Sequence, residues 1–322
     1  MNDEPLSFKD KVVSLLMGLL VTATAIEVGF QVMAPESSGF NNESDEYPSN
    51  PRGYFDELES KSGDAIYGIP MAFDPTTQAR VGTPLKPAAL ERILGLGDSQ
   101  GMGQGVRFEH TAYEQLSVLL DDRGINARVL NRSVRGYDVE EVVERARSEL
   151  SQHETIELAV YWLVLDDFGL DIERRTEREP SMSATVRYFA HAYDQWVVSK
   201  RTTEAYSSAF KGESLSLGTD ALVELDAVVS AHGATLLIAI MPLLYDFETY
   251  PFGAIHTELN AVCKAHKLAC IDLMSAFENQ SASALWVHPS DHHPNETAHG
   301  LIATELANRI VSTEALKPVT DP

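Results

Sequence analysis

The sequence predicts an α/β fold, in which three layers (α/β/α) surround a doubly wound parallel sheet of about five strands. Over residues 92–310, short apolar runs closed by glycine or polar residues alternate with longer segments of helical periodicity. Such alternation is typical of parallel sheets with right-handed crossovers. A chain of 322 residues with 44% hydrophobic residues can bury the core of one such domain and carry appendages.

The individual elements follow from the positions of these runs. Apolar runs of strand length predict strands at 92–96, 128–130, 157–165, 235–240 and 269–271. Helical periodicity predicts helices at about 108–123, 139–150, 220–232, 254–265 and 297–310. Before the first strand, residues 66–90 contain four prolines and are expected to lie across the domain as an irregular extended lead-in.

A candidate nucleophile follows the first strand. Gly97-Asp98-Ser99 ends the apolar run and precedes the glycine-rich stretch 100–105. Open α/β sheets carry their chemistry at the carboxyl ends of the strands, which is where Ser99 is expected. The alternative is an ordinary turn, because Gly, Asp and Ser are common turn residues.

A candidate base and its carboxylate occur together near the other end of the chain. A serine nucleophile needs a base to accept its proton and a carboxylate to orient that base. Asp291 and His293 can supply both from a single loop, and Pro294 suits the first turn of the following helix. The alternative is a surface histidine at a helix entry.

These segments resemble blocks of the SGNH hydrolases, also called GDSL-type esterases and lipases. Gly97-Asp98-Ser99 resembles the first block, and Asp291-x-His293-Pro294-Asn295 resembles the last block in the D-x-H-P-N form of many bacterial members. The segment Val129-Leu130-Asn131-Arg132-Ser133-Val134-Arg135-Gly136-Tyr137 is similar to the second block. The resemblance extends over residues 92–311 and implies the family's flavodoxin-like sheet.

The resemblance also implies roles for single residues. Ser99 would be the nucleophile, His293 the general base and then acid, and Asp291 the residue that orients His293. The backbone N–H groups of Ser99 and Gly136 would bind the oxyanion. The implied activity is hydrolysis of an ester, with an O-acyl group on a glycan as the favoured substrate. Acyl transfer between sugars remains open, because the same acyl-enzyme serves both reactions.

The third block departs from the family pattern. The strand at 158–165 is followed by Asp166-Asp167, so Asp166 occupies the place of the asparagine whose side chain binds the oxyanion. An ionised carboxylate has no proton to donate and repels the developing negative charge. Three interpretations stay open: Asp166 donates in protonated form because its pKa is raised, another group donates, or the protein is a weakened enzyme. The last would leave a non-catalytic binding protein that kept the fold.

Further residues are candidates for substrate binding. Asp98 lies beside Ser99, while Tyr245 and His256 follow the carboxyl end of the strand at 235–240 and can line a pocket. The long segment 168–218, with Tyr188, Phe189 and Trp196 at helical spacing, is a candidate for substrate selection or for a helix packed on the core.

Composition restricts partners and cofactors. The formal net charge of −23 argues against a nucleic-acid partner. No metal is expected, because there is no cysteine-based zinc pattern, and the histidines and acids over residues 288–299 are irregularly spaced. No cofactor is expected, because the glycines around Ser99 lack the dinucleotide-binding spacing. Cys263 and Cys270 are the two cysteines, and a disulfide and two buried thiols both remain open.

The amino terminus predicts export. Lys9 and Lys11 precede an apolar stretch at 12–26, which continues past Glu27 to residue 33 and then has about 22 residues, long enough to cross a bilayer core of ~30 Å. We expect a membrane anchor at 1–33, a flexible acidic linker at 34–65, a hydrolase domain at 66–314 outside the cytoplasm, periplasmic or at the cell surface, and a tail at 315–322. The alternative is secretion after signal-peptide cleavage near Ala25.

Overall fold

In a computed structural model of the chain, residues 8–33, 65–66, 69–168, 204, 206–288 and 291–316 are described. The chain divides into two compact units, Met1–Tyr47 with Ile172–Thr202 and Pro48–Asp171 with Thr203–Pro322. The expected linker up to residue 64, most of the segment 168–218 and the tail from residue 317 lie outside the described residues.

The described part of the first unit is helix α1 (Phe8–Met33). Several of its apolar side chains are exposed, among them Met17, Leu20 and Val21. Among the helices in the described part of the chain, none meets the combined length and hydropathy expected of a membrane span.

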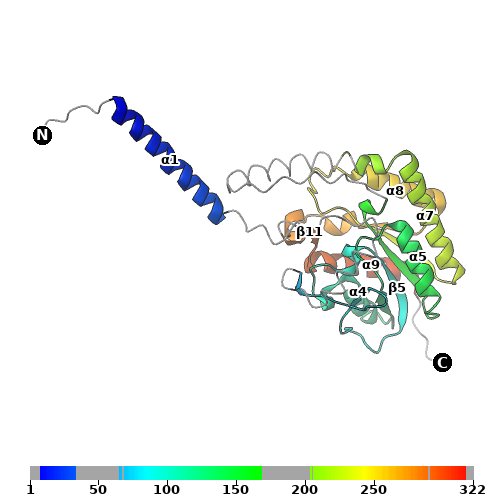
Figure 1. The fold of residues 1–322 in the computed structure, drawn as a ribbon. Helices are drawn as coiled ribbons and strands as arrows, with labels where there is room; N and C mark the ends of the chain where they lie inside the picture. The colour runs from blue at the N-terminus through cyan, green and yellow to red at the C-terminus, as the bar shows by residue number, and fades with distance from the viewer. Residues whose placement is uncertain are drawn as a thin grey trace. The chain divides into compact units, whose positions relative to one another are not determined.

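The second unit is built on a five-stranded parallel sheet with the order β6-β5-β7-β8-β9 (Figure 1). The strands are β5 (Glu91–Gly97), β6 (Arg128–Asn131), β7 (Leu158–Leu163), β8 (Thr235–Ile240) and β9 (Cys270–Asp272). The chain therefore starts at β5, adds β6 on one side of it, crosses back to place β7 on the other side, and continues outward through β8 to β9. This is the doubly wound order, with its topological switch point between β5 and β7, and it confirms the predicted fold class.

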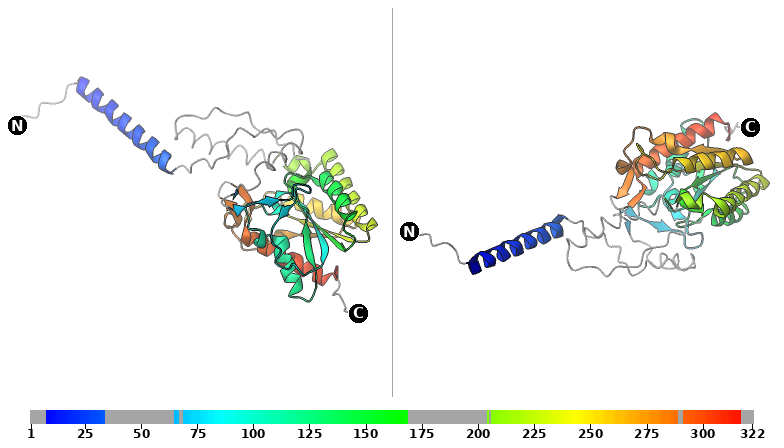
Figure 2. Two further views of the ribbon diagram at one scale, coloured as in Figure 1. Left: turned by 60° about the horizontal axis from the view of Figure 1, so that its bottom comes forward. Right: turned by 90° about the horizontal axis from the view of Figure 1, so that it is seen from above.

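Helices cover both faces of the sheet, giving the three layers visible in Figures 1 and 2. One face carries α4 (Ala112–Asp121) and α9 (Glu296–Ser312); the other carries α5 (Val139–Leu150), α7 (Gly212–Ala231) and α8 (Gly253–His266). Successive side chains of β7 alternate between the two layers. Leu158, Val160 and Trp162 pack in the α4/α9 core, whereas Ala159, Tyr161 and Leu163 pack in the other. Burial on both faces explains why the strand is apolar without interruption.

Shorter elements complete the unit. The lead-in forms two short antiparallel pairs, β1 (Ala65–Ile66) with β2 (Ile69–Pro70) and β3 (Ala72–Phe73) with β4 (Arg80–Val81), which the sequence did not predict, while residues 74–79 and 82–90 form turns and irregular segments as expected. A second small ribbon pairs β10 (Trp286–His288) with β11 (Asp291–Pro294). The remaining helical turns are α3 (Ser99–Met102), η1 (Phe108–His110), η2 (Leu165–Phe168), η3 (Leu273–Phe277) and η4 (Ala282–Leu285).

Two predicted helix starts are wrong. Helix α7 begins at Gly212 instead of residue 220. Its first turns contain glycine and serine, which are weak helix formers, so local propensity hides them. Tertiary packing overrides that preference. The Phe168 ring packs so closely on Gly218 that a β-carbon added to this glycine would lie only 2.1 Å from the nearest ring atom. Helix α4 begins at Ala112, because Phe108–His110 forms a separate 3₁₀ turn before it.

The two cysteines form a disulfide. Cys263 on α8 and Cys270 at the start of β9 are bonded across seven positions of sequence, with their Cα atoms 6.2 Å apart. The structure thus decides between the two alternatives left open by the sequence. The disulfide attaches the edge strand β9 covalently to helix α8, which precedes it.

Candidate active site

Ser99 lies at the carboxyl end of β5, on a tight turn into α3. Gly97 has a φ of +151°, and a β-carbon there would lie 3.2 Å from the Trp162 β-carbon, so the turn favours glycine. The Asp98 carboxylate caps α3 by accepting the Gln100 N–H at 2.8 Å. Ser99 is the first residue of α3, so its N–H has no acceptor within the helix. This places Ser99 beside the switch point, with its backbone donor unused by the helix.

Ser99, His293 and Asp291 form a continuous hydrogen-bonded line. Ser99 Oγ lies 2.8 Å from His293 Nε2, and His293 Nδ1 lies 2.5 Å from Asp291 Oδ1. The carboxylate at Nδ1 assigns the proton to that nitrogen and leaves the Nε2 lone pair facing the serine hydroxyl. Asp291 Oδ1 also accepts the His293 backbone N–H at 3.0 Å. Residues 194 positions apart in sequence thus meet in the geometry that activates a serine.

His293 is held by the β10/β11 ribbon. The Trp286 ring stacks on His292 at 3.9 Å, and its Nε1 donates to the Leu244 carbonyl at 2.7 Å, which ties the ribbon to the loop after β8. Asn295 then caps α9 by accepting the N–H groups of Thr297 and Ala298. The sequence interpretation had placed His293 on a loop and Pro294 in the first helical turn. Both belong to β11, because the helix begins only after the Asn295 cap.

The loop after β6 runs alongside this turn. Val134 N–H donates to the Gly97 carbonyl at 3.0 Å, and Asn131 Nδ2 donates to the Gly101 carbonyl at 3.0 Å. Gly136, two residues beyond Val134, has a φ of +75°, which glycine adopts readily. The bonds to Gly97 and Gly101 fix the segment leading to Gly136 against both sides of Ser99. The role of its N–H as an oxyanion donor stays a prediction.

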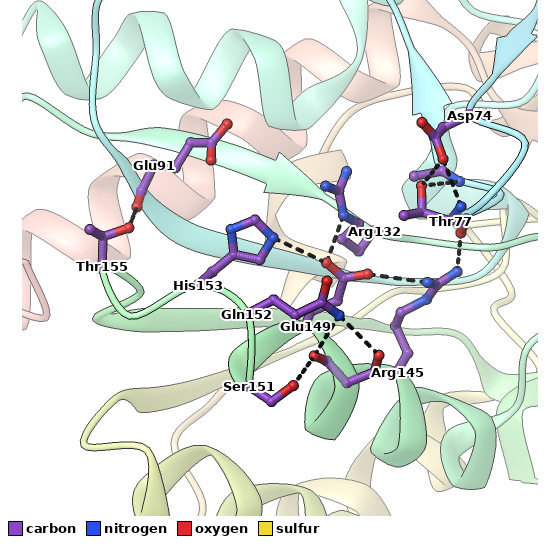
Figure 3. Close-up of polar contacts among 12 residues, drawn as sticks. Asp74, Thr77, Glu91, Arg132, Arg145, Glu149, Ser151, Gln152, His153 and Thr155 are labelled. Atoms are coloured by element: carbon purple, nitrogen blue, oxygen red, sulfur yellow. Dashed lines mark hydrogen bonds and ion pairs between the residues drawn. The ribbon is translucent and has the colours of Figure 1, made fainter.

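A buried ionic cluster anchors the same loop to α5 (Figure 3). The Glu149 carboxylate, whose side chain is 3% exposed, bonds Arg132 Nε at 2.8 Å and Arg145 Nη1 at 3.1 Å. Arg145 also donates to the Thr77 carbonyl, and this hydrogen bond connects the lead-in to α5. Arg132 is the first residue after β6, so its ion pair with Glu149 holds the start of the loop against α5.

Replacing Glu149 with glutamine is expected to lower the free energy of unfolding by about 2 kcal/mol. The change removes the charge that both arginines face, and breaking a buried pair is costly, although these arginines keep partial contact with water. Urea denaturation measures the difference. The matched control is Glu144→Gln, which affects an exposed pair with Arg147 and is expected to change stability by less than about 0.5 kcal/mol. Equal effects of the two substitutions would contradict the prediction.

Three carboxylates meet next to the serine turn. Asp98, Asp166 and Asp167 bring carboxylate oxygens within 4.8 Å of one another. Burial, and then the Asp166 carboxylate, raises the pKa of Asp98 from 3.8 to about 7. Burial, and then the charges of Asp98 and Asp166, raises the pKa of Asp167 well above its usual value, while Tyr161 Oη and the Val164 N–H donate to it at 2.6 and 2.9 Å. The cluster therefore retains protons at pH values where isolated carboxylates are ionised.

Asp166 is the member of this cluster with the most surface in contact with solvent as a whole residue, but its carboxylate group lies among protein atoms, and this desolvation is the largest cause that raises its pKa. The charge of His293 acts in the opposite direction, which places Asp166 within electrostatic reach of the imidazole. A protonated Asp166 can donate a hydrogen bond, as an asparagine would. The same three carboxylates are the group within the described ranges whose spacing could hold a metal ion. The histidines of residues 288–299 are not part of it.

The remaining predicted substrate residues differ in position. Tyr245 is 38% exposed and contacts the Phe252 ring edge to face at 6.2 Å, so its ring is available at the surface. His256 is buried, with Nδ1 2.9 Å from Asp272 and Nε2 3.2 Å from Tyr250 Oη. Asp98 faces the carboxylate cluster and its own helix turn. The substrate-binding roles of these three residues stay predictions, and the contacts of His256 are those of a core residue.

Sequence reasoning missed two buried residues beside the triad. Gln104 contacts Asp291 and His293, and nothing in the glycine-rich stretch 100–105 marks it. His299 is fully buried; its Nδ1 accepts the Ala112 N–H at 3.0 Å, and burial lowers its pKa to about 3, so it remains neutral. Its spacing from His293 gives no sequence signal, because the contact with α4 arises only in the folded chain.

Comparison with known proteins finds similarity in solved structures. No protein-family model matches the chain, and no curated protein matches it. TesA is 17% identical with a TM-score of 0.48, covering 70% of this chain and 100% of TesA. The psychrotrophic esterase EstA from Pseudoalteromonas sp., inhibited by monoethylphosphonate, is 16% identical with a TM-score of 0.45, covering 70% of this chain and 100% of the esterase.

A member of the lipolytic protein G-D-S-L family from Veillonella parvula is also similar. It is 14% identical with a TM-score of 0.44, and the match covers 69% of this chain and 99% of that protein. At such identities, similarity assigns no substrate or activity to this chain, so the function is argued from the site itself.

Proposed function

We propose that this protein is an exported serine ester hydrolase of the SGNH type. The observation that carries the proposal is the hydrogen-bonded line from Ser99 Oγ through His293 to Asp291, with distances of 2.8 and 2.5 Å. A hydroxyl, a base and an orienting carboxylate in this order form the arrangement that activates serine for attack on an acyl group. The favoured substrate is an O-acyl ester on a glycan.

The reaction follows from this geometry. Ser99 Oγ attacks the acyl carbonyl while its proton passes to His293 Nε2, and Asp291 stabilises the resulting imidazolium at Nδ1. The N–H groups of Ser99 and Gly136, with a protonated Asp166, bind the oxyanion. When the tetrahedral intermediate collapses, the bond to the alcohol breaks and His293 returns the proton to the leaving oxygen. Water, deprotonated by His293, then cleaves the acyl-enzyme and regenerates the serine.

Asp166 supports a second candidate function. If its carboxylate is ionised at the working pH, the site repels an oxyanion, and the chain acts as a binding protein that retained the fold. The intact line of Ser99, His293 and Asp291 favours hydrolysis. Transfer of the acyl group to a sugar differs from hydrolysis only in the acceptor.

The proposed location is outside the cytoplasm, through a tether formed by the amino-terminal segment. Lys9 and Lys11 support it, because they are followed by an apolar stretch at 12–26 that continues past Glu27 to residue 33. The Cys263–Cys270 disulfide supports it as well, because disulfides persist in oxidising compartments.

The experiment is covalent labelling of the full chain with a fluorophosphonate, together with turnover of a chromogenic acetate ester. We expect one phosphonate adduct per chain, located by mass spectrometry on the peptide carrying Ser99, and loss of ester turnover in proportion to labelling. A protein that neither labels nor hydrolyses the acetate over pH 5 to 9, and binds acylated glycans without cleaving them, would establish the binding function instead.

A further inference from the structure

Gln104 is a buried residue that belongs to the serine turn by its backbone. It is 3% exposed, and its N–H donates to the Ser99 carbonyl at 3.0 Å. The Arg80 guanidinium, from strand β4, donates to the carbonyls of Gly103 at 2.6 Å and Val106 at 2.5 Å, on either side of Gln104. Burial lowers the pKa of Arg80 to about 10, which still leaves it charged at neutral pH. The backbone of Gln104 is thus fixed relative to the nucleophile.

The side chain of Gln104 reaches the other end of the triad. Its Nε2 lies 3.4 Å from Asp291 Oδ2 and 3.5 Å from His293 Nδ1. The NH₂ end must face Asp291, because the opposite amide orientation would set a carbonyl oxygen against a carboxylate. The two oxygens of Asp291 are therefore used differently: Oδ1 accepts both N–H groups of His293, and Oδ2 faces Gln104.

Burial of this amide is costly for the fold. Gln104 Oε1 has no hydrogen-bond partner among the described residues, and an unpaired buried carbonyl lowers stability. An apolar side chain of similar volume, such as methionine, would avoid that cost. A polar group retained at such a position is expected where it serves a functional site.

We propose that Gln104 is a positioning residue that holds the Asp291 carboxylate from the side of the serine turn. As a neutral donor, it withdraws part of the carboxylate charge from Oδ2 and fixes the ring of His293 through Oδ1. Gln104 thus contacts both Ser99 and Asp291, which lie far apart in the sequence. This inference rests on the proposed function, since positioning matters only where His293 transfers protons.

The test compares the pH dependence of kcat/KM in Gln104→Met and Gln104→Asn. The acid limb reports the ionisation of His293 in the free protein. Other ionisable groups that act on this imidazole are common to all variants: Asp98, Asp166, Asp291, His292 and His299.

We expect both substitutions to move the acid limb to higher pH. Loss of the donor in Gln104→Met leaves more negative charge on Asp291, and in Gln104→Asn the shorter amide no longer reaches Oδ2, so both variants stabilise the imidazolium, by up to about one pH unit. In Gln104→Met, kcat is expected to fall about tenfold with KM within twofold of the native value, as befits lost alignment. The matched control is Gln152→Met, which makes the same change at an exposed residue between α5 and the start of β7 and is expected to leave the limb in place.

A second measurement does not depend on turnover. The pKa of His293 is read from its imidazole proton resonances, assigned with His293→Ala, in the native chain and in each Gln104 variant. Shifted resonances in a protein without ester turnover would support positioning while refuting the hydrolase. Active variants with the native acid limb and the native His293 titration would overturn the positioning role and leave the hydrolase standing. If Gln104→Met does not fold, Gln104→Asn, which keeps a polar side chain but moves the donor away from Asp291, decides alone.

Discussion

Replacement of Ser99 with alanine is expected to reduce kcat for a small chromogenic ester by about 10⁴- to 10⁶-fold, the range found when a nucleophile is removed from a working triad. The covalent route disappears with the hydroxyl, because His293 then has no proton to accept at 2.8 Å from its Nε2. Circular dichroism and urea denaturation should show a folded protein, since the small side chain lies at the rim of the sheet. Steady-state kinetics measure the effect.

The combination with His293→Ala makes this prediction sharper. Substitutions of residues that act as one unit have strongly non-additive effects. The kcat of the double variant, Ser99→Ala with His293→Ala, is therefore expected to lie within about threefold of the kcat of each single variant. If the loss of kcat in the double variant equalled the product of the two single losses, Ser99 and His293 would contribute separately. That result would contradict the hydrogen-bonded line as the catalytic unit.

The second large effect concerns Asp166. Its raised pKa means that the carboxyl is protonated and able to donate at lower pH, and becomes an ionised, repelling group as the pH rises through that pKa. The native kcat is therefore expected to fall on the alkaline side. Asp166→Asn supplies a donor at every pH, so it should abolish this fall and raise kcat at pH 9 by about 10²-fold, the worth of one oxyanion donor.

The carboxylate cluster requires a control, because its members titrate together. Asp98→Asn makes the same carboxyl-to-amide change in the cluster, and asparagine caps a helix as well as aspartate does. The alkaline fall should persist in Asp98→Asn and vanish in Asp166→Asn. An alkaline fall lost in Asp98→Asn but kept in Asp166→Asn would assign the donor role away from Asp166.

The sequence predicted those parts of the fold whose signals are local. Strand β8 (Thr235–Ile240) and helix α5 (Val139–Leu150) have the predicted bounds. In α5 the boundary follows from the Asp138 capping box with Glu141, a signal contained in four consecutive residues. Residues Ser99, Asp291 and His293 were brought together by the resemblance of two separate blocks, and the structure places them within hydrogen-bond distance.

The parts that could not be predicted depend on distant contacts. Helix α7 extends to Gly212 through packing such as that of Phe168 against Gly218. Gln104 meets Asp291 only because the serine turn and the β11 ribbon converge at one edge of the sheet. Glu149 is an ordinary helix residue in the sequence, and its burial between Arg132 and Arg145 follows from how the loop after β6 crosses α5.

The order of the sheet also affects how molecules of this protein meet each other. The two outer strands, β6 with four residues and β9 with three, are shorter than the inner strands, which have six or seven. An exposed strand edge is a template on which another chain can add hydrogen bonds, and a short edge offers few of them. With a net charge of −23 opposing close approach, the fold resists edge-to-edge aggregation at high local concentration.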